Sequence, residues 1–162
     1  MKTGGGTCYG AKFDSNFKVL HGKAKNLEEC LAFQGSKYVQ SDMTNCFAEV
    51  KHDLKEGNNV LFTGTPCQVA AIKKYLNRDN IDASGLYTVD IVCHGAPGSV
   101  VWQDYINYIQ NKEHSKLINF SFRYKPYGWK GIRKWEKVYQ FDQGEFIPEY
   151  VQKKSIDEGK LL

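Results

Sequence analysis

The chain has 162 residues, with 22 Lys and Arg against 18 Asp and Glu, for a formal net charge of +4. The hydrophobic share of 41% and the charged share of 25% are ordinary for globular proteins, which excludes a disordered chain, and the length predicts a single domain over residues 1–162. No apolar run approaches the roughly 20 residues of a membrane span, and no signal peptide follows Met1. We therefore expect a cytoplasmic protein that does not associate with a membrane.

The first third of the sequence predicts a hairpin followed by two helices. Residues 7–13 and 17–24 have the composition of strands, and Asp14–Asn16 between them are typical turn residues. Residues 27–33 have room for two helical turns. Apolar residues recur at helical spacing over residues 47–54, which predicts an amphipathic helix.

In the central third, a predicted strand followed by a predicted helix occurs twice. A short apolar strand over residues 60–62 is followed by helical spacing over residues 67–76, and a β-rich stretch over residues 86–92 is followed by helical spacing over residues 101–109. Apolar strands that alternate with helices are typical of a buried parallel sheet built from right-handed βαβ units.

The residue pattern changes from alternating strands and helices to strands alone after about residue 117. Residues 118–124 and 137–141 are expected to form peripheral antiparallel strands around a loop at residues 127–131, and residues 150–162 are charged with no predicted element. The sequence therefore predicts an α/β fold, with a mixed, mainly parallel sheet, flanking helices and a small antiparallel C-terminal β region.

Cys67 is the first candidate functional residue. It opens a predicted helix directly after a strand, and Gly64, Thr65 and Pro66 precede it. The unpaired N–H groups and the dipole at a helix N-terminus stabilise a thiolate, a phosphate or an anionic cofactor. The structural alternative is a small residue that suits a tight turn from strand to helix.

Cys93 and His94 occupy the equivalent turn after the next strand. If the two strands are parallel neighbours, about 4.8 Å apart, both turns lie at the carboxyl edge of one sheet, where open α/β folds bind ligands. Two thiols and an imidazole would then converge. Alternatively, His94 is a hydrogen-bonded structural residue.

The other cysteines have no pattern of their own. The total of five is odd and no export signal is present, so we expect thiols rather than a disulfide framework. Cys8, Cys30 and Cys46 have no partner at CxxC spacing, and we interpret them as core or surface thiols.

Two further segments have suitable side chains for binding. The polar loop at residues 35–42 could bind phosphate and ribose, although by composition alone it is an ordinary connector. Cations and aromatic residues alternate later in the chain and could stack nucleic-acid bases. We favour the edge of a hairpin for them and expect no nucleic-acid partner; these residues are Arg123, Lys125, Trp129, Lys130, Arg133 and Trp135.

Four ordered motifs resemble the coenzyme F420 hydrogenase/dehydrogenase beta-subunit family over nearly the whole chain. They are GSKYVQSD at residues 35–42, VLFTGTPCQVA at 60–70, VDIVCHGAP at 89–97, and FRYK at 122–125 with GWK at 128–130. The resemblance implies an iron–sulfur and flavin oxidoreductase module that transfers electrons between a [4Fe–4S] cluster, FAD and F420 or another redox acceptor. A redox partner protein or ferredoxin-like segment and a small-molecule redox substrate are implied as well.

The resemblance also implies roles for individual residues. Cys67 and Cys93 look like two iron–sulfur ligands, and His94 is the implied catalytic residue that contacts or tunes the flavin. The positions that resemble flavin-binding ones are Ser36, Lys37, Tyr38, Gln40, Ser41, Thr65 and Gln68.

The departures from the family pattern leave alternatives open. Family members usually carry a cysteine-rich ferredoxin-like segment and a flavin-holding helix ahead of this region, and further cysteines after it, so residues 1–162 are expected to be a truncated core of the family domain with an incomplete cluster site. One alternative is a non-catalytic truncated interaction domain. Another is a cysteine-nucleophile enzyme that uses Cys67 and His94.

Overall fold

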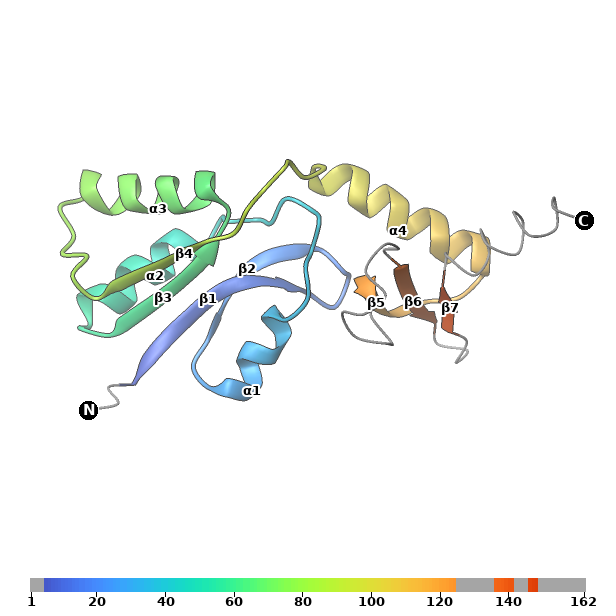
Figure 1. Ribbon diagram of the computed structural model, residues 1–162, viewed down its shortest axis with the longest axis horizontal. Helices are drawn as coiled ribbons and strands as arrows, with labels where there is room; N and C mark the ends of the chain where they lie inside the picture. The colour runs from blue at the N-terminus through green and yellow to red at the C-terminus, as the bar shows by residue number, and fades with distance from the viewer. Residues whose placement is uncertain (1–4, 125–135, 142–145, 149–162) are drawn as a thin grey trace, which may run out of the picture. The chain divides into compact units, whose positions relative to one another are not determined.

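The computed structural model describes residues 5–124, 136–141 and 146–148 (Figure 1). These residues fall into two compact units. The first comprises residues 5–34 and 39–99, and the second comprises residues 35–38 and the described residues from 100 onward. The single domain over residues 1–162 stays a prediction.

The first unit opens with an antiparallel hairpin. Strand β1 (Gly6–Phe13) pairs with β2 (Val19–Ala24), and the Asp14 carboxylate accepts the backbone N–H groups of Asn16 and Lys18 in the turn. The prediction that the second strand begins at residue 17 is wrong. Phe17 has a φ of 59°, and this left-handed conformation belongs to a turn and not to a strand.

The hairpin extends into a four-stranded sheet of order β2-β1-β3-β4. Strand β3 (Asn59–Gly64) runs parallel to β1 and to β4 (Leu86–Asp90), and helix α3 (Pro66–Arg78) connects β3 to β4. A mixed, mainly parallel sheet with flanking helices confirms the predicted α/β class. The strand predicted over residues 86–92 ends at Asp90, and Ile91 and Val92 are exposed.

One face of this sheet is covered by helix α2 (Cys46–Lys55) and by α3. Alternate residues of β3 point to this face because successive side chains of a strand alternate. The apolar side chains of both helices share one core with β1 and β3, made of Tyr9, Cys46, Val50, Leu54, Val60, Phe62, Val69, Ile72 and Leu76.

The opposite face is only partly covered. Helix α1 (Leu27–Cys30) and the 3-10 helix η1 (Leu31–Phe33) lie beside β1, where a Cβ added at Gly10 would be 2.9 Å from the Phe33 ring. Beside them, Tyr87 is 59% exposed and Val89 47% exposed. The prediction of a buried parallel sheet is therefore wrong for this face of β4, because α1 and η1 lie beside β1 and leave Tyr87 and Val89 exposed.

The second unit combines a helix with an antiparallel sheet. Helix α4 (Ser99–Glu113) precedes strands β5 (Leu117–Tyr124), β6 (Glu136–Phe141) and β7 (Phe146–Pro148), which pair antiparallel in that order. The sheet confirms the small antiparallel C-terminal region; β7 was not predicted. The loop predicted at residues 127–131, the GWK motif and the end at 150–162 lie outside the described residues.

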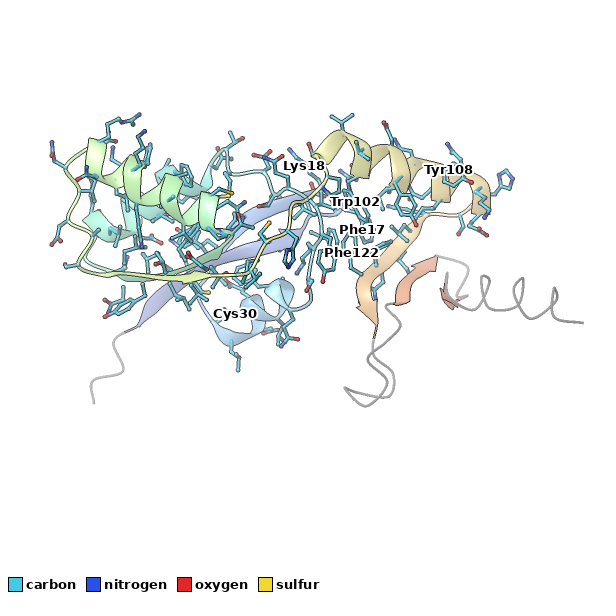
Figure 2. All side chains as sticks on the ribbon, turned by 45° about the horizontal axis from the view of Figure 1, so that its top comes forward. Phe17, Lys18, Cys30, Trp102, Tyr108 and Phe122 are labelled. Atoms are coloured by element: carbon cyan, nitrogen blue, oxygen red, sulfur yellow. The ribbon has the colours of Figure 1, made fainter. Side chains whose placement is uncertain are left out.

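Aromatic side chains join α4 to β5 (Figure 2). The Trp102 ring centroid lies 4.9 Å from that of Phe120 and 5.0 Å from that of Phe122, and Trp102 and Phe120 are buried. Edge-to-face ring pairs such as Trp102 with Phe120 add to the burial of apolar area. Within the described residues, no helix combines the length and hydropathy that crossing a membrane requires.

Candidate functional site at the carboxyl edge of the sheet

Strands β3 and β4 end side by side. Gly64 pairs with Asp90 in the parallel register, and the Ile91 N–H donates to the Gly64 carbonyl at 2.9 Å. The segments that follow, Thr65–Gln68 and Cys93–Pro97, therefore leave the same edge of the sheet. The parallel pairing thus brings the two turns to one edge, as predicted. The predicted convergence of two thiols and an imidazole is not seen, because among the described residues Cys67, Cys93 and His94 do not form a three-ligand group.

The first turn of α3 is held closely by its own residues. Thr65 is the N-cap, Pro66 occupies the first helical position, and the Thr65 N–H donates to Gln68 Oε1 at 3.0 Å. A Cβ at Gly64 would lie 3.0 Å from the Phe62 ring and 3.1 Å from Gln68 Oε1, so glycine leaves room for the Gln68 amide. Cys67 is exposed on this turn.

A buried hydrogen-bond chain connects Gln68 to β3 through two other segments. Gln68 Nε2 donates to Ser41 Oγ at 2.8 Å, Ser41 Oγ lies 2.7 Å from His21 Nδ1, and His21 Nε2 lies 2.9 Å from the Thr63 carbonyl oxygen. A carbonyl oxygen only accepts, so His21 Nε2 carries the proton. In the neutral imidazole Nδ1 then accepts from the Ser41 hydroxyl, and every bond in the chain has one donor and one acceptor.

His21 is the functional-site residue that sequence reasoning missed. It is 7% exposed and its ring stacks on Phe62 with centroids 5.3 Å apart. Burial lowers its pKa, and the hydrogen bond to the Thr63 carbonyl only partly opposes this effect. A single histidine in a strand carries no local signal of this role, because its partners lie about 20 and 42 residues away along the chain.

The lowered pKa of His21 predicts an acid-sensitive fold. The unfolded chain takes up a proton near the ordinary histidine pKa of about 6.5, while the folded imidazole stays neutral until a lower pH. The stability contributed by neutral His21 is therefore complete above that pH and is lost as the pH falls toward the folded pKa. We expect the free energy of unfolding to decrease by at most about 1.4 kcal/mol per pH unit in this window.

Urea unfolding across this pH range measures the effect. His21→Gln is expected to flatten the slope of stability against pH, whereas His52→Gln, at an exposed position on α2, serves as the matched control and is expected to keep it. An unchanged slope in His21→Gln would contradict the assignment.

The segment around Ser41 is anchored on both sides. The Asp42 N–H donates to the Val19 carbonyl and the His21 N–H donates to the Asp42 carbonyl, each at 2.9 Å, so this segment runs parallel to β2. The Gln40 N–H donates to the Pro97 carbonyl at 3.0 Å. Three predicted segments, containing Ser41, Gln68 and Pro97, are thus joined by hydrogen bonds at one edge of the sheet.

The second turn is open to solvent. Cys93 and His94 are exposed, and the Gly95 N–H lies 3.4 Å from Cys93 Sγ. Gly95 has a φ of 104°, a conformation that side chains with a Cβ rarely adopt. The turn therefore depends on glycine directly after His94, and it leaves the Cys93 thiol and the His94 imidazole accessible.

Three predicted flavin-binding residues belong to the second unit: Ser36, Lys37 and Tyr38. Ser36 is exposed, and burial lowers the pKa of the half-buried Lys37 to about 8. The Tyr38 ring meets the Phe122 ring edge-on, with centroids 5.6 Å apart. The other four, Gln40, Ser41, Thr65 and Gln68, belong to the first unit, where hydrogen bonds link Ser41 to Gln68 and Gln68 to Thr65.

The thiols divide between the sheet edge and the rest of the first unit. Cys67 and Cys93 are exposed on the two turns, Cys46 is 1% exposed in the core, and Cys8 and Cys30 are half-buried. Among the residues that the structure describes, no three His, Cys, Asp or Glu side chains are grouped to hold a metal ion.

Comparison with known proteins identifies the family. The sequence profile for the C-terminal region of the coenzyme F420 hydrogenase/dehydrogenase beta subunit matches residues 57–158, more than half of the chain. The chain belongs to this family. The recognised family is confirmed, and the matched region includes three of the four motifs, whereas GSKYVQSD at residues 35–42 lies outside it. No curated protein sequence gives a significant match to the chain.

A solved structure has the same fold. It is titled "Xenon derivatization of the F420-reducing [NiFe] hydrogenase complex from Methanosarcina barkeri", and its matching chain is 20% identical with a TM-score of 0.53. The match covers 91% of this chain and 50% of that chain, so the family member described here spans about half the length of the neighbour. At this identity the likeness shows the fold alone.

Proposed function

We propose that the chain is a redox module that transfers electrons between a [4Fe–4S] cluster, FAD and an F420-like or other redox acceptor. Family membership supports the redox class. The observation that carries the proposal is the hydrogen-bonded junction of Ser41, Gln68 and Pro97, because it joins three family-like motifs at the edge where open α/β sheets bind ligands. The F420-reducing hydrogenase complex with the same fold supports a protein redox partner and a small-molecule substrate.

The residues at this edge suit a flavin through one exposed amide and the first turn of α3. Gln40 is exposed, and Thr65 and Gln68 lie at the N-terminus of α3, where the helix dipole favours an anionic group such as a pyrophosphate. The Gln68 amide is already bonded to the Thr65 N–H and to Ser41, so Gln68 shapes this turn. Ser41 is buried and its hydroxyl is engaged by His21 and Gln68, so we assign it to positioning Gln68. Ser36, Lys37 and Tyr38 stay predicted flavin-binding residues.

FAD, when bound, supplies one-electron and hydride chemistry, while the protein supplies position and electrostatics. Within this proposal His94 is the catalytic residue. Its exposed imidazole has nitrogen atoms that can hydrogen-bond a flavin, and its neighbour Gly95 fixes the course of the turn. With a pKa of about 8, Lys37 is mostly cationic at neutral pH and suits an anionic group.

The described residues do not complete a cluster by themselves. A [4Fe–4S] cluster is held by four thiolates, and two exposed thiols, Cys67 and Cys93, follow the paired strands. We propose that these two are ligands and that the redox partner or a ferredoxin-like segment provides the others. The cytoplasmic location and the absence of a nucleic-acid partner stay predictions.

Anaerobic reconstitution of the full-length protein with iron, sulfide and FAD tests the proposal. We expect visible absorbance of a cluster and retention of FAD after gel filtration. Cys67→Ser and Cys93→Ser are each expected to remove most of the cluster absorbance, while Cys30→Ser, at a half-buried thiol away from this edge, is the matched control and is expected to keep it. Gln68→Ala is expected to weaken FAD retention while the cluster absorbance persists.

If the full-length protein in the presence of its partner gains neither absorbance nor flavin, the redox proposal is wrong. The interaction-domain alternative requires that outcome, and it is favoured by the exposed apolar residues of β4, Tyr87 and Val89. Tight FAD binding would exclude it.

One distance favours the cysteine-nucleophile alternative. Thr65 Oγ1 lies 3.1 Å from Cys67 Sγ in the first turn of α3, so the hydroxyl can hydrogen-bond the sulfur of an exposed cysteine. Labelling with iodoacetamide at mildly acidic pH distinguishes the two functions. Fast labelling of Cys67 that is lost in Thr65→Val would support a nucleophile, whereas slow labelling together with cluster assembly would support the redox module.

A further inference from the structure

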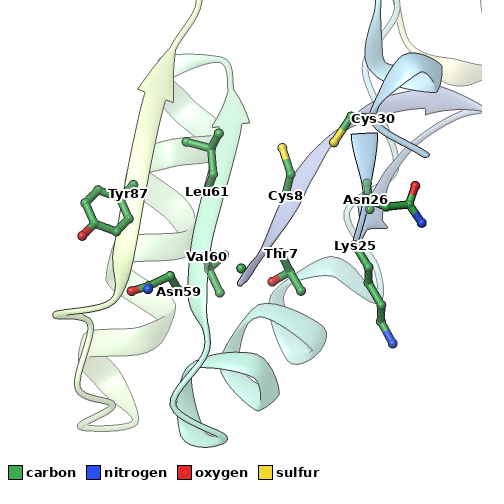
Figure 3. Close-up of a pocket in the computed structure, with 11 residues that line it drawn as sticks. Thr7, Cys8, Lys25, Asn26, Cys30, Asn59, Val60, Leu61 and Tyr87 are labelled. Carbon is green, nitrogen blue, oxygen red and sulfur yellow. The ribbon is translucent and has the colours of Figure 1, made fainter. Parts of the chain in front are cut away.

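Two thiols outside the sheet edge share one pocket. Cys8 near the start of β1 and Cys30 at the end of α1 both line a cavity of about 300 Å³ on the face of the sheet opposite α2 and α3 (Figure 3). In Figure 3 Cys8 lies between Leu61 and Cys30, and the Cys30 sulfur is directed toward β1. Leu61 of β3 and Tyr87 of β4 continue the wall of the pocket and are both partly exposed.

Local hydrogen bonds hold Cys30 over Cys8. Cys8 pairs with Ala24 in the hairpin, so the chain enters α1 directly beside it. Asn26 caps α1 by accepting the Glu29 N–H at 2.9 Å, and the Glu29 carboxylate accepts the Lys25 N–H and the Asn26 amide, each at 2.8 Å. These bonds fix the single turn of helix that carries Cys30, and Cys30 lines the same pocket as Cys8.

The raised pKa of Cys8 distinguishes the two thiols. Burial, together with the charge of Cys30 and a hydrogen bond with Cys30, raises the pKa of Cys8 to about 11. Cys8 therefore keeps its proton near neutral pH, which leaves Cys30 to attack an oxidant and Cys8 to act as the resolving thiol.

We propose that Cys8 and Cys30 form a reversible intramolecular disulfide when the protein meets a peroxide. The Cys30 thiolate attacks one peroxide oxygen, so an S–O bond forms, the O–O bond breaks, and water leaves after the second oxygen is protonated. Cys8 then attacks the Cys30 sulfur, so the S–S bond forms, the S–O bond breaks, and a second water leaves. Two thiols are oxidised and one hydrogen peroxide is reduced to two waters.

The surroundings favour this pair over the remaining thiols. Cys46 is 1% exposed and burial raises its pKa to about 12, so it is both inaccessible and protonated. Cys67 and Cys93 are exposed on other turns. The pocket beside Cys8 and Cys30 is far larger than the roughly 30 Å³ that a water molecule occupies, so a hydrogen peroxide molecule fits.

Hydrogen peroxide treatment followed by alkylation and peptide mapping tests the proposal. In the Cys67→Ser/Cys93→Ser background, which removes the exposed thiols, we expect the titrated thiol count to fall by two, one peptide pair linked through Cys8 and Cys30, and full recovery with dithiothreitol. Either Cys8→Ser or Cys30→Ser is expected to abolish the linked pair. In Cys8→Ser, Cys30 is expected to be trapped by dimedone as the sulfenic acid.

Three outcomes would overturn the proposal. The first is an unchanged thiol count, and the second is a linked pair that contains Cys46. The third is a sulfenic acid that forms on Cys8 in the Cys30→Ser variant while none forms on Cys30 in the Cys8→Ser variant. Circular dichroism of each variant before oxidation shows whether the fold is retained, and the two single variants provide independent tests. Cluster and flavin content are not needed for this measurement, so its result is separate from that of the redox proposal.

Discussion

Asp53→Ala is expected to lower the free energy of unfolding by about 3–5 kcal/mol, because it breaks a buried ion pair and leaves its partners unsatisfied. Asp53 is 2% exposed on α2, and its carboxylate accepts Thr7 Oγ1 and Tyr9 Oη at 2.8 Å and Lys23 Nζ at 2.5 Å. These bonds tie α2 to both strands of the hairpin. Chemical denaturation near neutral pH measures the loss.

Asp79→Asn is the matched control. Asp79 also pairs with two cations, Lys51 at 2.7 Å and Arg78 at 2.8 Å, but its side chain at the C-terminal end of α3 is 21% exposed against 3% for Asp53, so water and salt screen these pairs more. Its effect is expected to be much smaller than that of Asp53→Ala. Equal effects of the two variants would contradict the importance of burial.

The pH dependence of Asp53 follows from the same contacts. Burial by itself would raise its pKa, but the hydrogen bonds from Lys23, Tyr9 and Thr7 outweigh it and hold the pKa below the usual range. The stabilisation is therefore complete above the ordinary carboxyl pKa of about 3.9 and is lost as the pH falls through the lower folded value. The acid limb of the stability curve is expected to be shallower in Asp53→Ala.

Phe62→Ala is expected to cost about 3–5 kcal/mol, because Phe→Ala at a fully buried position leaves a cavity as well as losing apolar burial. Phe62 is 0% exposed at the centre of β3, packs in the core with α2 and α3, and stacks on His21. The variant therefore loosens the core and the Gln68–Ser41–His21 hydrogen-bond chain together. Thermal or urea unfolding gives the stability, and FAD retention gives the effect on the site.

Leu61→Ala is the control for this substitution. Leu61 is the neighbouring residue on the same strand but faces the other side of the sheet, and it is 38% exposed. We expect a loss of no more than about 1 kcal/mol. A loss as large as that of Phe62→Ala would show that an unidentified group covers the open face of β3.

Most elements could be predicted because their signals are local. Alternating and helical periodicities gave α2, α3, α4 and the central strands to within a few residues, and Thr65–Pro66 marked the start of α3. The start of β2 and the end of β4 were misplaced, since a left-handed Phe17 and the edge position of β4 leave no mark on hydrophobic periodicity. The strand β7, at three residues, is too short to carry a periodic signal.

The candidate site was predictable only in part. Parallel βαβ units place the turns at Cys67 and Cys93 on one edge, and this follows from the order of strands and helices along the chain. The junction itself, in which Gln68 reaches Ser41 and Ser41 reaches His21, depends on side chains brought together from distant segments. The same holds for Cys8 and Cys30, which sequence reasoning treated as unrelated core or surface thiols.

Periodicity and ordered motifs are properties of neighbouring residues, so the α/β class, the family and the residues at the two turns could be inferred from the order of amino acids alone. Which polar groups remain available and which are already paired depends on the folded arrangement. It shows that Ser41 is occupied by His21 and Gln68, that β4 leaves apolar residues exposed, and that Cys8 and Cys30 meet in one pocket. These contacts join residues far apart in the chain, and no local pattern encodes such distances.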